Sequence, residues 1–182
     1  PFLTALGVVR EKENGSIYNI FASTVTRGEF LIGKLTPYVG ISVINFLVLW
    51  LMAAGLFGAP FKGNPLFFFL ASVIYVICTT GIGLLVSLFV RTQVAAMMLT
   101  VIVTIVPSVL YSGLLVPIAS MDPAGQFEAH LFPAMYYTDI VLGSFLKGVG
   151  LEQLWGKVLA LLIYAVVLWT ASFLMFHKRP KS

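Results

Sequence analysis

The chain has 182 residues, of which 59% are hydrophobic and only 10% are charged, and its mean hydropathy is +1.00. A soluble domain is usually about 25% charged, and a fold of this length could not cover so much apolar surface in water. The composition therefore excludes a soluble globular protein and indicates a membrane protein, while the net charge of +4 comes from dispersed basic residues, which argues against nucleic-acid binding.

The N-terminal residues 1–9 are apolar but too few to cross a bilayer. We expect them to be the end of a membrane helix that begins earlier in a longer polypeptide. The charged segment, residues 10–35, follows directly. Its residues 10–34 hold seven of the eighteen Asp, Glu, Lys and Arg residues, whereas the next 56 residues hold one, Lys62. Such a change from charged to uncharged sequence marks the boundary between water and bilayer.

The charged segment contains local helix signals. An Asn-Gly pair at positions 14–15 is a helix stop, and Ser16 can cap a short helix over residues 17–22. Thr26 and Glu29 fit a capping box that starts an interfacial helix leading into the first span. A short exposed helix between two membrane helices suits a contact with a soluble partner, but a solvated loop with incidental capping residues fits the same sequence.

Four stretches have about the length that a transmembrane helix needs, roughly 20 apolar residues. They are residues 36–58, 66–90, 94–118 and 158–176, and none contains Asp, Glu, Lys, Arg or His. Basic residues assign the sides of the membrane. If the charged segment is cytoplasmic, eight basic residues lie on that side: Arg10, Lys12, Arg27, Lys34, Arg91, Lys178, Arg179 and Lys181. Three lie outside: Lys62, Lys147 and Lys157. We therefore expect the C-terminus to be cytoplasmic.

Residues 119–156 join the third and fourth predicted spans on the outer side and are too apolar for an ordinary loop. Pro133 divides them into two short helical pieces, residues 126–132 and 134–146, neither of which is long enough to cross the bilayer. Two arrangements fit this pattern: re-entrant helices that enter the outer leaflet and return, or helices that lie on the surface.

Polar side chains inside the spans suggest where a pathway could run. A row of hydroxyl residues at a spacing of four follows one side of the third span: Thr100, Thr104, Ser108 and Ser112. Pro107 lies among them and would free the carbonyl of Val103 and kink the helix. Asn45, the most polar side chain of the first span, should face protein or a cavity. The row fits a pathway wall, but it also fits close helix packing.

No catalytic or metal-binding pattern is evident. The predicted spans carry no ionisable group of the kind that proton-driven or voltage-driven machines use. No Walker-type glycine loop, nucleophile–base arrangement or recurring metal-ligand spacing appears in the sequence. These features argue against a membrane enzyme, so any uphill transport must be powered from outside the chain.

Three segments together resemble the ABC-2 type permeases, the membrane subunits of bacterial ABC exporters. They are VREKENGSI with TRGEFLIGKL in the charged segment, YSGLLVPIASM at the end of the third span, and FPAMYY in the outer segment. The resemblance implies an all-α, polytopic membrane helical bundle in the inner membrane. It implies four complete transmembrane helices, a partial N-terminal one, a cytoplasmic coupling helix and outer re-entrant helices.

The resemblance also implies partners. A separate or fused ABC ATPase would bind ATP and Mg, no cofactor would bind this chain, and a second permease half would complete a homo- or heterodimer in the lipid bilayer. The substrate would be hydrophobic or amphipathic, either drug-like or lipid-like. The residues expected to couple to the ATPase are Arg10, Glu11, Lys12, Glu13, Ser16, Ile17, Arg27 and Glu29. A non-transporting multi-pass scaffold or sensor subunit is the alternative from another class.

Overall fold

The computed structural model of the chain describes residues 1–15 and 26–176, and within these ranges every regular element is a helix. The α-helices are α1 (Phe2–Glu13), α3 (Arg27–Leu51), α4 (Pro65–Phe89), α5 (Gln93–Thr100), α6 (Val106–Tyr111), α7 (Pro123–His130), α8 (Pro133–Leu142) and α9 (Leu151–Met175). The shorter elements are the π-helical turns η1 (Met52–Leu56), η2 (Val101–Ile105) and η4 (Gly143–Lys147) and the 3-10 turn η3 (Ile118–Ser120). The predicted all-α class is confirmed.

Four helical segments are long and apolar enough to cross a membrane, as the predicted polytopic bundle requires. They are Gly28–Leu56, Pro65–Phe89, Gln93–Tyr111 and Leu151–Met175. The first span is continuous with the helix that Thr26 caps, so the expected interfacial helix forms its first turns. Pro37 lies inside this helix, which continues past it to Leu51.

The third span is shorter than the predicted range 94–118, because its helix ends at Tyr111. Gly113 follows with a φ of +81°, a left-handed conformation that glycine adopts without a steric penalty. Pro117, four residues on, has no N–H with which to continue a helix. The chain therefore leaves the span before its apolar sequence ends.

The fourth span is longer than the predicted range 158–176, because its helix begins at Leu151. Lys157 lies in the second turn of this helix, where a charge would be costly in lipid without a partner. Its Nζ atom lies 2.6 Å from a carboxylate oxygen of Asp139 and 5.5 Å from the centre of the Tyr136 ring. Because of these contacts, the helix can include Lys157, although the sequence alone predicts that the fourth span begins only after this residue.

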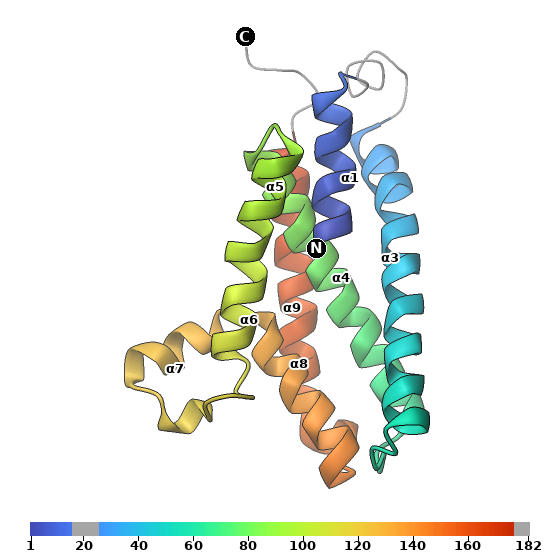
Figure 1. Cartoon of the computed structure of the whole chain (residues 1–182), viewed down its shortest axis with the longest axis vertical. Coiled ribbons are helices and arrows are strands. Elements are labelled where there is room, and N and C mark those ends of the chain that lie inside the picture. The colour runs from blue at the N-terminus through green and yellow to red at the C-terminus, as the bar shows by residue number, and fades with distance from the viewer. Residues whose placement is uncertain (16–25, 177–182) are drawn as a thin grey trace.

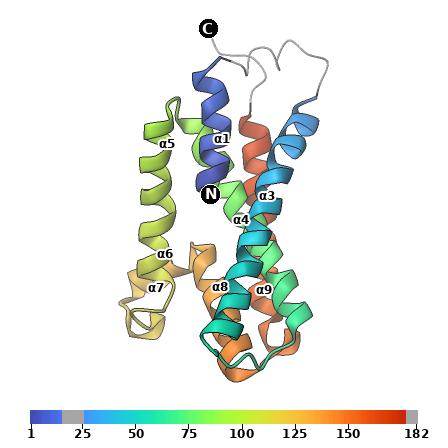
Figure 2. The same cartoon turned by 45° about the vertical axis from the view of Figure 1, so that its right-hand side comes forward.

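Helix α4 forms the centre of the bundle and contacts α1, α3, α5, α8 and α9 (Figures 1 and 2). We call the end of the bundle where α1 and α9 finish and α3 begins the charged end, because residues 10–13, Lys34 and Arg91 lie there. Helices α3, α4 and α9 run the full height of the bundle to the opposite end, whereas α1 occupies only the half next to the charged end.

The contact between α4 and α9, with Ile140 of α8 packed beside it, builds the main core. Its buried residues are Phe68, Ala71, Cys78, Ile140, Leu161 and Ala165. Two hydrogen bonds cross the same interface: the Trp169 indole N–H donates to the Ile77 carbonyl at 3.1 Å, and the Cys78 thiol donates to the Leu161 carbonyl at 3.0 Å. Small residues and interhelical hydrogen bonds hold helices together in lipid, so this interface fixes α9 against the central helix.

Helices α7 and α8 take the place of an ordinary loop between the third and fourth spans. We call residues 123–142, which contain both helices and the turn between them, the α7–α8 hairpin. The carbonyl oxygen of His130, at the turn, accepts hydrogen bonds from the hydroxyls of Tyr164 (2.5 Å) and Tyr136 (3.2 Å). Tyr164 is 13 residues after Leu151, or about 20 Å along α9 at 1.5 Å per residue. The turn therefore lies near mid-height of the spans, and this depth favours the re-entrant arrangement over helices that lie on the surface.

The turn η4, which follows α8, is hydrogen-bonded to the loop that leads into α4. The carbonyl oxygen of Ser144 accepts hydrogen bonds from the backbone N–H groups of Lys62 (3.2 Å) and Gly63 (2.8 Å). The hairpin thus reaches from mid-height of the bundle back to its opposite end (Figure 1).

Candidate functional site

The charged end begins with the local structure that the sequence predicts. Helix α1 ends at Glu13, the Asn14 N–H donates to the Arg10 carbonyl at 3.0 Å, and Gly15 adopts a φ of +72°. Ser16, Ile17 and the predicted short helix over residues 17–22 lie outside the described residues.

The capping box at the start of α3 is confirmed. The Glu29 N–H donates to the Thr26 hydroxyl oxygen at 3.3 Å, and the Thr26 N–H donates to the Glu29 carboxylate at 2.8 Å. Arg27 is the first residue of α3. The box thus sets the residue at which the chain re-enters the bundle.

Glu11 connects α1 to α3. Its carboxylate forms an ion pair with the Lys34 ammonium, and both side chains are partly covered by protein. The two residues are 23 positions apart in the sequence. The pair fastens the last turn of α1 to the first turns of the first span.

Lys12 connects α1 to the end of α4. Its ammonium donates a hydrogen bond to the carbonyl oxygen of Ser87, in the last turn of α4. The last carbonyls of a helix have no partner within the helix and carry its negative dipole end, so a lysine is a favourable cap there. Burial lowers the pKa of Lys12, and the nearby charge of Arg91 lowers it further.

Glu13 connects α1 to the beginning of α5. Its carboxylate accepts hydrogen bonds from the Gln93 backbone N–H at 3.3 Å and from the Gln93 side-chain amide at 2.8 Å. Gln93 is the first residue of α5, where unpaired N–H groups and the positive dipole end favour an acidic partner. Lys12 thus meets the negative dipole end of α4, and Glu13 meets the positive dipole end of α5, on the two sides of the turn that joins these helices.

We call these three connections the charged-end junction: Glu11 with Lys34, Lys12 with Ser87, and Glu13 with Gln93. Sequence reasoning placed the three α1 residues at a surface for a partner and missed their partners within the chain. Arg10 is exposed and, together with Glu11, lines a polar hollow of about 560 Å³ between α1, α3 and α5. Asn14 and Lys34 line the same hollow.

A second candidate site is a central cavity of about 450 Å³ between α3, α4, the third span and the α7–α8 turn. Three of the predicted pathway residues, Asn45, Thr104 and Ser108, line it together. The other polar side chains in its wall are Ser42, Tyr75 and Thr79. The structure thus brings polar groups of three spans to one hollow.

Thr100 and Ser112, the two other predicted pathway residues, do not line this cavity. Both are buried, and the Thr100 hydroxyl donates to the Ala96 carbonyl at 2.6 Å. The π-helical turn η2 lies between Thr100 and Ser108 and precedes Pro107. A π-helical turn changes the angular spacing of the residues that follow it, so a row drawn at a spacing of four does not stay on one face.

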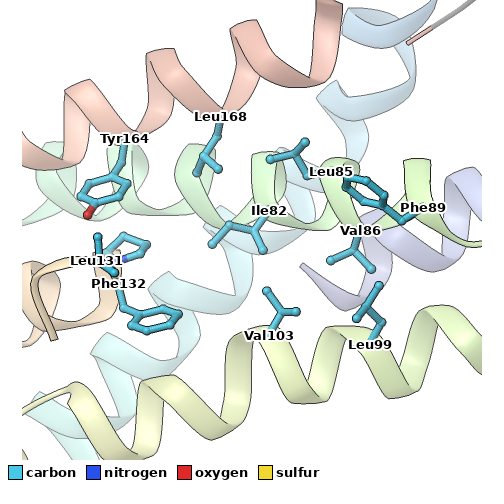
Figure 3. Close-up of a pocket in the computed structure, with 11 residues that line it drawn as sticks. Ile82, Leu85, Val86, Phe89, Leu99, Val103, Leu131, Phe132, Tyr164 and Leu168 are labelled. Atoms are coloured by element: carbon cyan, nitrogen blue, oxygen red, sulfur yellow. The ribbon is translucent and has the colours of Figure 1, made fainter. Parts of the chain in front are cut away.

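Figure 3 shows an apolar groove of about 440 Å³, which shares part of its wall with the central cavity. Ile82, Val103, Phe132 and Pro133 line both hollows. The rest of its wall consists of apolar side chains and Tyr164: Leu85, Val86, Phe89, Leu99, Leu131, Tyr164 and Leu168. The sequence offers no signal for this groove, because its lining resembles any lipid-facing or core surface. Among residues 1–15 and 26–176, no group of three His, Cys, Asp or Glu side chains could hold a metal ion.

The four spans, the hairpin between two of them and the polar cavity define the class of the molecule, a polytopic α-helical membrane protein. A family model described as "ABC-2 family transporter protein" matches residues 1–174. The chain therefore belongs to the ABC-2 transporter family, which confirms the resemblance seen in its motifs.

Curated relatives share most of the chain. The probable multidrug ABC transporter permease YbhS of Escherichia coli (strain K12) is 30% identical over 174 residues, covering 96% of the chain and 44% of that protein. YbhR, a probable multidrug ABC transporter permease of the same strain, is 28% identical, covering 97% of the chain and 48% of that protein. The ABC transporter G family member 20 of Dictyostelium discoideum is 26% identical, covering 99% of the chain and 25% of that protein. The chain thus spans less than half the length of these relatives, and no solved structure matches it.

Proposed function

We propose that the chain belongs to the permease subunit of an ATP-driven ABC-2 exporter and forms part of its translocation pathway. The observation that carries the proposal is the family match over residues 1–174 on a bundle of four spans. The bacterial relatives that match almost the whole chain are themselves named as permeases, which supports the same function.

The energy source is an ABC ATPase, either a separate subunit or a fused domain, that binds ATP and Mg. The charged segment faces this ATPase in the cytoplasm. Arg10 is exposed at its start, and Arg27 and Glu29 begin the helix at its end. Ser16 and Ile17 belong to the same contact. The charged end, the turn at Arg91 and the C-terminus lie on the cytoplasmic side of the inner membrane, as the distribution of basic residues indicates.

The substrate is hydrophobic or amphipathic. Two adjoining hollows support this class: the central cavity offers the amide of Asn45 and the hydroxyls of Thr104 and Ser108, and the groove beside it is apolar. An amphipathic molecule can place its hydrogen-bonding part in the first hollow and its apolar part in the second. The relatives' names, which describe multidrug transport, point in the same direction. A second permease half completes the pathway, within lipid.

The test is to express the full permease with the ATPase encoded beside it and to purify the complex. We expect the ATPase to copurify and its hydrolysis rate to rise when the permease is reconstituted with it. An ATPase that neither binds nor responds to the permease would contradict the proposal. Such a result would favour the alternative of a passive scaffold or sensor subunit.

A further inference from the structure

We infer that Glu11, Lys12 and Glu13 are positioning residues that fasten the charged segment to three spans, so that a movement of this segment reaches all three. The inference rests on the proposed function, because it assigns a role to residues of the coupling region. It differs from that proposal in one respect: these three side chains act on partners within the chain rather than on the ATPase.

Glu11, Lys12 and Glu13 are consecutive residues in the last turn of α1. Consecutive residues of an α-helix point about 100° apart, so Glu11, Lys12 and Glu13 project in three directions from the last turn of α1. The contacted elements differ accordingly: α3 for Glu11, α4 for Lys12 and α5 for Glu13. A run of charges that only faced water would not find a different helix in each direction.

The charge of each of the three residues is complementary to the group that it contacts. The acidic Glu11 meets the ammonium of Lys34, the basic Lys12 meets the carbonyl end of α4, and the acidic Glu13 meets the N–H end of α5. Each contact has the favourable sign. Exchanging the order of acidic and basic residues would make at least two of the three contacts unfavourable.

The three partners, Lys34, Ser87 and Gln93, lie on the three spans that line the central cavity. Lys34 lies in the first turns of the first span, and the other two partners lie on either side of the turn between the second and third spans. The third span bears Thr104 and Ser108 in the wall of the central cavity. A displacement of the charged segment is therefore passed through the junction to helices that form the cavity wall.

A charge exchange between Glu11 and Lys34 tests the inference in the full permease with its ATPase. We expect Glu11→Lys and Lys34→Glu to lower ATP-driven transport by on the order of tenfold each while the ATPase still copurifies. The double variant should recover transport to within about twofold of the original, because the pair is restored with reversed charges. Glu152→Lys is the matched control, because it reverses the charge of an exposed glutamate in the first turn of α9, at the opposite end of the bundle from the junction.

Recovery in the double variant is the decisive result. If the single variants release the ATPase and the double variant does not rebind it, Glu11 contacts the ATPase directly and the inference is wrong, while the proposed function stands. If a single variant fails to accumulate in the membrane, recovery of accumulation in the double variant supports the pair, and continued loss overturns it. An ATPase that neither copurifies with the original permease nor changes its hydrolysis rate in its presence would instead contradict the proposed function.

A conservative change at the third connection gives an independent measurement. Glu13→Gln keeps an oxygen that can accept from Gln93, whereas Glu13→Ala removes it. We expect the glutamine variant to keep most of the transport activity and the alanine variant to lose on the order of tenfold. Equal activity in the two variants at the original level would overturn the role assigned to Glu13.

Discussion

The hydroxyl of Tyr164 donates a hydrogen bond to the carbonyl oxygen of His130 at 2.5 Å, and this bond fixes the turn of the α7–α8 hairpin against the middle of α9. The hairpin turn also places Phe132 and Pro133 in the walls of both the central cavity and the apolar groove. Tyr164 thus ties the turn that borders both hollows to the middle of α9.

Tyr164→Phe should lower the free energy of unfolding by about 0.5–1.5 kcal/mol, because the His130 carbonyl loses a donor where water is scarce. Thermal unfolding of the detergent-solubilised permease measures the change. Tyr136→Phe is the matched control, since its hydroxyl reaches the same carbonyl at the longer distance of 3.2 Å and should matter less. An equal or larger effect of the control would show that Tyr164 does not hold the turn.

Gly63→Ala should destabilise the opposite end of the bundle by about 1–3 kcal/mol, the usual cost of forcing extra atoms into a packed contact. A Cβ atom at position 63 would lie 3.0 Å from both the Cα atom and the carbonyl oxygen of Ser144. Gly150→Ala is the control, because a Cβ atom there would meet no atom within 4 Å. Unfolding midpoints of the two variants should differ, and identical midpoints would argue against close docking of the hairpin end.

Ser108→Phe should reduce transport by on the order of tenfold, because the ring fills part of the central cavity and each 1.4 kcal/mol of lost binding is a factor of ten. Membrane accumulation and ATPase copurification should stay unchanged. Leu110→Phe is the control, since Leu110 is exposed and does not line the cavity. Normal transport by the Ser108 variant would mean that the substrate passes elsewhere.

Cysteine labelling should assign the two ends of the bundle to the two sides of the membrane. We expect Lys147→Cys to react with an impermeant maleimide in intact cells, and Asn14→Cys to react only after the cells are permeabilised. Both positions are exposed, whereas the natural Cys78 is buried and should contribute little background. The reverse labelling pattern would overturn the proposed orientation.

Local signals in the sequence predicted local structure well. The helix stop at positions 14–15 and the capping box of Thr26 and Glu29 both depend on residues within three or four positions of each other. Hydropathy located the four spans but not two of their ends. Gly113 breaks the third span inside an apolar run, and Lys157 remains inside the fourth because Asp139 pairs with it.

The candidate sites depended on contacts that the sequence does not reveal. Asn45 and the pair Thr104 and Ser108 were each recognised as polar residues in a span, but only the packing of α3 against the rest of the bundle brings them to one cavity. The exclusion of Thr100 follows from the π-helical turn η2, which hydropathy and residue spacing do not predict. The partner of Glu13 lies 80 positions away, so its role could not be found from local sequence.

The same separation has a consequence for synthesis. Glu13 leaves the ribosome 80 residues before Gln93, which at about 5–20 residues per second is an interval of roughly 4–16 s. For most of that time neither the end of α4 nor the beginning of α5 has been made, so α1 lacks both partners. The tip of α1 can therefore complete its contacts only after the second span and the beginning of the third have been made.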